Sequence, residues 1–75
     1  MNIKVFGQLT DVFGGDNIQV KNANDVRELK TELIHSFPVL SGKTFVIAVN
    51  KKVIHENIAL TGDAEIALLP PFSGG

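Results

Sequence analysis

Residues 25–38 read DVRELKTELIHSFP, and they contain the clearest secondary-structure pattern of the 75-residue chain. The apolar side chains of this stretch recur at three- and four-residue spacing, at Val26, Leu29, Leu33 and Phe37. Charged residues occupy the other faces, which predicts an amphipathic helix. Asp25, with Glu28 three residues later, is typical of a helix N-cap, and Pro38 disfavours helical geometry in the residue before it. The sequence therefore predicts one helix over Val26–Ser36.

The segments on either side of this helix have the composition and alternation of β-strands. The predicted strands are residues 2–6, 17–21, 44–50, 53–54 and 64–69. Residues 7–16 are expected to form a loop that ends in a glycine-rich turn. The order β-β-α-β-β-β predicts an α+β fold, with one helix packed on a mixed sheet of four to five strands. With the first and last strands adjacent at the centre, this is the β-grasp, or ubiquitin-like, arrangement.

The strand alternation also assigns residues to the two faces of the sheet. Six apolar residues are expected to face the helix: Ile3, Val5, Ile18, Val20, Ile66 and Leu68. Five others are expected on the opposite face: Phe6, Val46, Ala48, Ala67 and Leu69. Such a face is normally polar, and an exposed apolar patch is typical of a partner-binding surface. We therefore predict that these five residues bind a partner, the alternative being that loops cover them.

Composition argues against several classes of function. The chain has no cysteine, so it has no disulfide and no thiolate metal site, and its two histidines lack ligand spacing. The formal net charge is -1, and the basic residues are mostly spread singly, unlike those of a nucleic-acid-binding domain. No apolar run approaches the roughly 20 residues of a membrane helix, and no signal peptide is apparent. We expect a cytoplasmic domain with no nucleic-acid or membrane partner, no metal and no bound cofactor.

The last six residues are the most distinctive part of the chain: Pro70, Pro71, Phe72, Ser73, Gly74 and Gly75. Two prolines favour an extended path, and six extended residues span about 20 Å. Glycines have no side chain, so the final residues would fit a narrow tunnel. We therefore predict a β-grasp domain over residues 1–69 and a flexible tail over residues 70–75 that inserts into a partner and presents the Gly75 carboxylate there. A tail without function is the alternative.

A carboxylate must be activated before a nucleophile can attack it, and the chain has no evident means of activation. It has no G-x-x-x-x-G-K-[ST] loop, since Gly14 and Gly15 are followed by Asp16. Ser73 has no adjacent base and is not expected to be a nucleophile. About 75 residues also leave little material for a catalytic pocket beyond one core. The sequence thus favours a carrier or binding role over a free-standing enzyme, with activation supplied by another protein.

Residues 60–75 read LTGDAEIALLPPFSGG and closely resemble the end of molybdopterin synthase small subunits, of the sulfur-carrier family. That family typically reads L-x-D/G-G-D-E-V-A-x-x-P-P-V-S/T-G-G there. Residues 3–9 are similar to its first strand and the F-A-x-L after it, and residues 48–50 to its A-V-N strand end. The chain departs from the family at three positions. Gly7 stands where the family often has alanine, and Phe72 stands where a smaller aliphatic residue is usual. Ala64 is an insertion or a substitution within the G-D-E turn of the family.

The resemblance implies a cycle in which an E1-like adenylyltransferase and sulfurtransferase uses ATP to adenylate Gly75 and converts it to a thiocarboxylate. The tail then enters the large subunit of molybdopterin synthase. There the sulfur passes to cyclic pyranopterin monophosphate in molybdenum cofactor biosynthesis. The chain would be the non-catalytic, sulfur-carrying subunit, in an assembly of two small and two large subunits. Gly74 would give clearance, and Phe72 would dock together with the sheet face.

Four other functions remain open at this point. The chain resembles sulfur carriers of thiamine synthesis, although these usually lack the two prolines and often carry N-G-E near the first hairpin. A carrier for cysteine or another thio-product would have the same tail. A ubiquitin-like modifier would join Gly75 to lysines of target proteins. A plain interaction module would leave the tail inert.

Overall fold

The computed structural model describes residues 1–70, with the remaining five at the C-terminal end left undescribed. The elements follow the predicted order, with two short helices added: β1 (Asn2–Val5), α1 (Leu9–Phe13), β2 (Asn17–Gln19), α2 (Val26–Ser36), the 3-10 helix η1 (Pro38–Gly42), β3 (Val46–Val49), β4 (Lys52–Ile54) and β5 (Ile66–Leu69). None of the helices within residues 1–70 is both long enough and apolar enough to cross a membrane.

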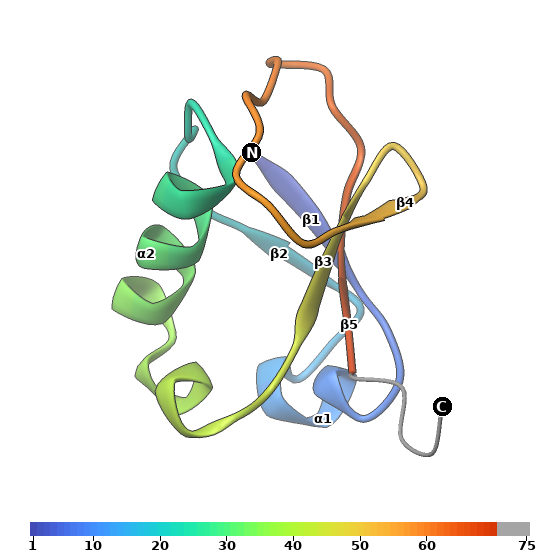
Figure 1. The fold of residues 1–75 in the computed structure, drawn as a ribbon. Coiled ribbons are helices and arrows are strands. Elements are labelled where there is room, and N and C mark those ends of the chain that lie inside the picture. The colour runs from blue at the N-terminus through green and yellow to red at the C-terminus, as the bar shows by residue number, and fades with distance from the viewer. Residues whose placement is uncertain (71–75) are drawn as a thin grey trace.

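The five strands form one mixed sheet in the order β2-β1-β5-β3-β4 (Figure 1). β1 and β5 are parallel, with Ile3 opposite Ile66, while the other neighbouring strands are antiparallel. The predicted pairing of the first and last strands is therefore confirmed, and β5 lies at the centre of the sheet. A mixed sheet with one main helix is the β-grasp arrangement that the element order predicted.

The core lies between α2 and one face of the sheet (Figure 1). All six strand residues predicted to face the helix are buried: Ile3, Val5, Ile18, Val20, Ile66 and Leu68. Leu29 and Leu33 of α2 pack against them, and Leu9 and Leu40 complete the core from α1 and η1. The alternation in the segments of β1, β2 and β5 thus predicted their buried face, because successive side chains of a strand point to opposite sides.

Helix α2 begins and ends where the sequence predicted. Asp25 is the N-cap, and its side chain accepts a hydrogen bond of 2.8 Å from the backbone N–H of Glu28. The Glu28 carboxylate reaches back to the backbone N–H of Asn24 at 3.1 Å, one residue earlier than in the usual capping box. The cap thus satisfies N–H groups that no helical carbonyl can reach.

The loop after β4 satisfies the next free N–H groups of the same helix. The backbone N–H of Val26 donates to the carbonyl of Ile58 at 3.0 Å. The N–H of Arg27 donates to Oδ1 of Asn57 at 2.8 Å. These bonds fix the loop to the start of α2, on the helix side of the sheet.

Residues 7–16 are not the plain loop that the sequence predicted, because they contain α1. Leu9 of this helix is buried, and Gly14, in left-handed conformation, ends it with a hydrogen bond to the carbonyl of Thr10. A five-residue helix is too short to show a 3.6-residue repeat, so it gives no periodic signal.

The 3-10 helix η1 follows almost directly after α2. Pro38 stands at its start, where a missing N–H costs nothing. The ring of Phe37 meets that of Phe13 edge to face, with centroids 4.8 Å apart, and so joins the ends of α1 and α2.

Four of the five strands are shorter than predicted, and β4 begins one residue earlier than predicted.

Candidate functional site

The sheet face turned away from α2 carries six apolar side chains, which we call the outer patch: Phe6, Val46, Ala48, Val53, Ala67 and Leu69. The strand register places them side by side. Ala48 of β3 lies between Ala67 of β5 and Val53 of β4, and Val46 lies opposite Leu69. The structure therefore brings together all five residues that the sequence predicted for this face.

Most of the outer patch surrounds a hollow of about 310 Å³, lined by Phe6, Ala48, Lys51, Val53, Glu65, Ala67 and Leu69. Phe6 is 46% exposed and Val53 37% exposed, whereas Ala48 is buried between its neighbours. Within residues 1–70, loops therefore leave this hollow open to solvent. It combines an apolar floor with one cation and one anion, a composition that suits a protein partner better than a small polar substrate.

Sequence reasoning missed three residues of this hollow: Lys51, Val53 and Glu65. Val53 joins the patch because it pairs with Ala48 across two strands. Lys51 joins it through the turn between β3 and β4. Glu65 could have been placed on this face from its alternation with Ala67 and Leu69 in the predicted strand, whereas the places of Val53 and Lys51 depend on which strands become neighbours.

That turn has a left-handed backbone at two successive residues that are not glycine, with φ of 51° at Asn50 and 71° at Lys51. Two positive φ angles are the requirement of a type I′ hairpin turn, in which glycine is preferred at the second position. The N–H of Asn50 donates to the carbonyl of Glu65 at 2.8 Å, and the N–H of Glu65 donates to Oδ1 of Asn50 at 3.0 Å. The turn is thereby held against the chain that enters β5.

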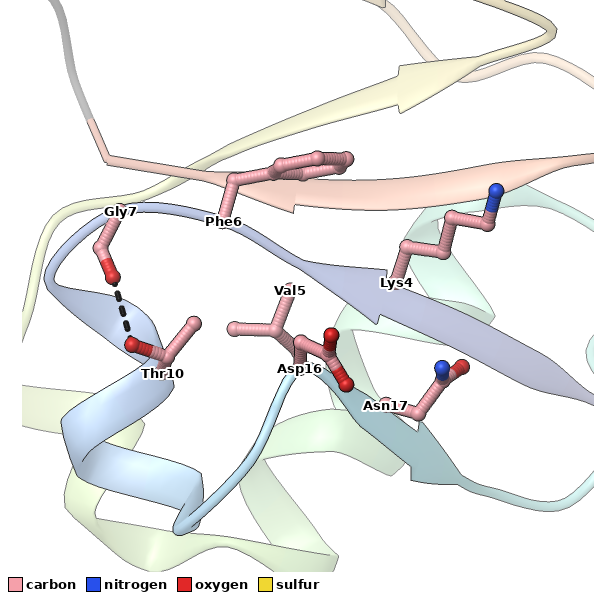
Figure 2. A pocket seen from close by; sticks show the side chains of 7 residues that line it. All are labelled: Lys4, Val5, Phe6, Gly7, Thr10, Asp16 and Asn17. Carbon is pink, nitrogen blue, oxygen red and sulfur yellow. Dashed lines mark hydrogen bonds between the residues drawn. The ribbon is translucent and has the colours of Figure 1, made fainter.

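Across β1 the outer face becomes polar. Lys4 lies between Ala67 of β5 and Asn17 of β2 in the strand register. Figure 2 shows Lys4 and Phe6 on one side of β1 and Val5 on the other. Next to them is a second hollow, of about 430 Å³, that also includes Asp16 and Asn17. One half of the outer face is therefore apolar and the other half is charged or polar.

Pro70 follows the last residue of β5 and packs against Gly7, the second residue after β1. Gly7 has a φ of +62°, and a β-carbon built on it would lie 2.8 Å from Cγ and 3.2 Å from Cδ of Pro70. The ring of Pro70 therefore occupies the space that a side chain at position 7 would need. From the sequence, Gly7 stood out only as a departure from the resembled family, because its contact lies at the other end of the chain.

Pro70 is the one predicted tail residue within the described part of the chain. Pro71, Phe72, Ser73, Gly74 and Gly75 lie outside the described residues, and their predicted roles stay predictions.

The carboxylate of Asp25, at the start of α2 on the helix side of the sheet, has a structural role. The backbone N–H of Glu28 and the side chain of Asn57 donate to Asp25, and with the nearby Arg27 they lower the pKa of its carboxyl. These contacts belong to the cap of α2. Residues 1–70 contain no group of three or more His, Cys, Asp or Glu side chains that could hold a metal ion.

Comparison with known proteins matches residues 3–75 to the ThiS family. A chain from the protein–protein complex of subunits 1 and 2 of the molybdopterin-converting factor from Helicobacter pylori 26695 is 30% identical. The match covers 99% of this chain and 96% of that one, with a TM-score of 0.71.

Two crystal structures from Haloferax volcanii are also similar. SAMP1 is 25% identical over 100% of this chain and 98% of its own, with a TM-score of 0.78. A structure of small archaeal modifier protein 1 is 24% identical, over 96% of this chain and 97% of its own, with a TM-score of 0.76. At this identity the match supports the fold but no function. Together with the match of a family model to nearly the whole chain, these likenesses decide the family. The chain belongs to the ThiS family, a family of ubiquitin-like sulfur carriers with the β-grasp fold.

Proposed function

We propose that this chain carries sulfur as a thiocarboxylate on Gly75 and delivers it to cyclic pyranopterin monophosphate in the large subunit of molybdopterin synthase. The observation that carries the proposal is the 30% identity, along 99% of this chain, to a chain of the complex of subunits 1 and 2 of the molybdopterin-converting factor. The prolines and glycines of residues 70–75 support the same role.

The proposed chemistry begins with a separate E1-like enzyme and ATP. An oxygen of the Gly75 carboxylate attacks the α-phosphorus of ATP, and pyrophosphate leaves, which gives an acyl-adenylate. A hydrosulfide equivalent then attacks the carbonyl carbon, and AMP leaves with the oxygen, which gives the thiocarboxylate. When the sulfur is passed on, water returns the oxygen to carbon. The partners supply the catalytic groups, and this chain supplies only the reacting terminus.

The outer patch is the surface that we propose for docking. Leu69 belongs to this patch and directly precedes Pro70, so a partner bound over the patch lies beside the point where the chain leaves β5. Phe6 offers a large, exposed apolar side chain of the kind that dominates interface energies. Lys51 and Glu65 add charges that fix the orientation of the partner. We propose that the activating enzyme and the large subunit use this surface in turn, in the cytoplasm, and that the synthase holds two copies of each subunit.

Intact mass spectrometry tests the carrier function. The full chain is incubated with its activating enzyme, ATP and a sulfur donor, and then weighed. We expect the mass gain of one oxygen replaced by one sulfur, and no gain when ATP is omitted. A chain of unchanged mass in a system that charges a known carrier would contradict the proposal. Adding the large subunit and cyclic pyranopterin monophosphate to the charged chain then decides the pathway, because a carrier for thiamine or cysteine would keep its sulfur.

A ubiquitin-like protein modifier is the second candidate. The match to SAMP1 along the whole of both chains, with a TM-score of 0.78, favours it. Both functions begin with the same acyl-adenylate, and they differ in whether sulfur or a lysine amine receives the acyl group. Isopeptide links from Gly75 to lysines of cell proteins, found by mass spectrometry after digestion, would favour the modifier.

A further inference from the structure

We propose that the large subunit contacts this chain on two sides of the point where it leaves the sheet: at the outer patch and at a second hollow, which we call the exit hollow. The exit hollow has a volume of about 310 Å³ and is lined by residues of α1, by the end of η1 with the residues after it, and by Pro70. The inference rests on the proposed docking to the large subunit and extends it to a surface that the sequence did not predict.

The chain leaves the sheet between the two hollows. Leu69, the last residue of β5, lines the hollow of the outer patch, and the next residue, Pro70, lines the exit hollow. Helix α1 lies beside the end of β5 (Figure 1). A partner that encloses the chain after Pro70 must therefore pass close to both hollows.

The outer patch alone is small for a stable interface. Each of its six residues is at most 46% exposed, and Ala48 is only 5% exposed. Even a large aromatic side chain buries no more than about 250 Å², so the six together offer well under the roughly 800 Å² per partner of a standard interface. A stable complex therefore needs further surface, and the exit hollow offers it next to the emerging chain.

The walls of the exit hollow are tied to the core. On one wall, Leu9 of α1 is 4% exposed, and the N–H and the hydroxyl of Thr10 both donate to the Gly7 carbonyl, at 3.1 and 2.9 Å. On the other wall, the N–H of Lys43 donates at 3.1 Å to the carbonyl of Leu40, a core residue. The hollow is thus formed before a partner binds, which lowers the entropic cost of binding.

Lys43 gives the exit hollow a positive charge. Its side chain is exposed, and no carboxylate within residues 1–70 lines the same hollow. The hollow of the outer patch, in contrast, is lined by both Lys51 and Glu65. Charges at an interface are complementary and fix its orientation. The surface of the large subunit that faces Lys43 therefore carries an aspartate or a glutamate.

Titration calorimetry of the full chain with the large subunit tests the charge. In about 0.1 M salt, Lys43→Glu should raise Kd at least about tenfold, because like charges across an interface repel each other. In about 1 M salt this ratio should shrink, because salt screens the repulsion. The matched control is Lys30→Glu, the same change at an exposed residue of α2, which should alter Kd less than about twofold. Equal losses for the two variants, or a Lys43→Glu loss that salt does not reduce, would overturn the inference.

A second pair of variants tests the shape of the exit hollow. Gln8 lines it, is exposed and makes no side-chain hydrogen bond to the start of α1. Gln8→Trp should therefore keep the fold, as urea unfolding would verify, but fill the hollow and raise Kd at least about tenfold at both salt concentrations. The control is Gln19→Trp, since exposed Gln19 pairs with Asn2 at the end of the sheet away from Pro70. An unchanged Kd for Gln8→Trp, or an equal loss for Gln19→Trp, would contradict the second contact.

Charging with sulfur, followed by intact mass spectrometry, separates this inference from the carrier function. A chain that needs Lys43 and Gln8 for binding but never gains sulfur would refute the carrier function alone. A charged chain that binds the large subunit with the same Kd whatever residues stand at these two positions would refute only the role of the exit hollow.

Discussion

Asn50 and Glu65 hold each other through two hydrogen bonds, one from each backbone N–H, at 2.8 and 3.0 Å. This pairing clamps the hairpin turn between β3 and β4 to the start of β5, and it fixes Lys51 beside the hollow of the outer patch. Asparagine tolerates the left-handed backbone of this turn, but lysine adopts it at a cost. Residues held in such conformations often serve function, so the turn offers a test of whether Lys51 is kept for binding.

Lys51→Gly should make the isolated chain more stable and its binding to the large subunit weaker. Glycine relieves a left-handed penalty of about 1 to 2 kcal/mol. The greater freedom of glycine in the unfolded chain costs about 0.5 to 1 kcal/mol, so we expect a net gain in the free energy of unfolding of up to about 1.5 kcal/mol. Urea unfolding and titration calorimetry measure the two effects. Lys52→Gly is the matched control, because Lys52 lies in β4 without a positive φ and should only be destabilised by glycine. Unchanged binding by Lys51→Gly would remove Lys51 from the docking surface.

Phe6→Asp should abolish most of the affinity for the large subunit while the fold survives. Phe6 is 46% exposed, so a charge there is not buried in the free chain, but it would face the apolar partner in the complex. We expect a loss of at least about 2 kcal/mol, or roughly thirtyfold in Kd, as for other aromatic hot spots. The control is Val39→Asp, which changes an apolar side chain that is 52% exposed on η1, away from the outer patch. Equal losses for both variants would show that the outer patch is not the docking site.

Acid should destabilise the chain partly through Asp25. Its hydrogen bonds lower the pKa of the carboxyl in the folded chain, so the stability that they provide is fully present above the unfolded pKa of about 3.9. It is lost as the pH falls through the lower, folded value. Asp25→Asn can still cap α2 but cannot titrate. Its unfolding free energy should therefore fall less steeply than that of the wild type below about pH 4, as measured by urea unfolding across that range. Parallel curves for the two proteins would contradict this role.

Removing Gly75 should leave the fold unchanged and prevent charging with sulfur. Among the described residues, 1–70, the buried core is built from residues between Ile3 and Leu68, so we expect the last residue to contribute nothing to stability. The shortened chain should unfold at the same urea concentration as the full chain and still bind the large subunit through the outer patch. A loss of stability on deletion would mean that the tail supports the domain.

The fold was largely predictable because its signals are local. Helix α2 combines a strong 3.6-residue repeat with an N-cap at Asp25 and a proline just past its end, so its predicted bounds match those observed. The buried faces of β1, β2 and β5 followed from simple alternation. Helix α1 could not be predicted, because five residues with Leu9 as their one buried side chain give no repeat to read.

The candidate site was predictable only in part, for the same physical reason. Phe6, Ala67 and Leu69 could be assigned to the outer face from their own strands. The inclusion of Lys51 depends on a turn held by Glu65, and the close packing around Gly7 depends on a proline at the far end of the chain. Such relationships arise from tertiary structure, which brings together residues that are far apart in the sequence. The local sequence around one residue does not indicate its contact with the other.

The measurement that tests the central claim most directly is fragmentation of the intact, charged chain in a mass spectrometer. The full chain is first treated with its activating enzyme, ATP and a sulfur donor. We predict that every fragment containing Gly75 gains the mass difference between sulfur and oxygen, and that fragments ending before Gly75 keep their original mass. Sulfur on any other residue, or a chain that gains none while a known carrier is charged in the same mixture, would contradict the account.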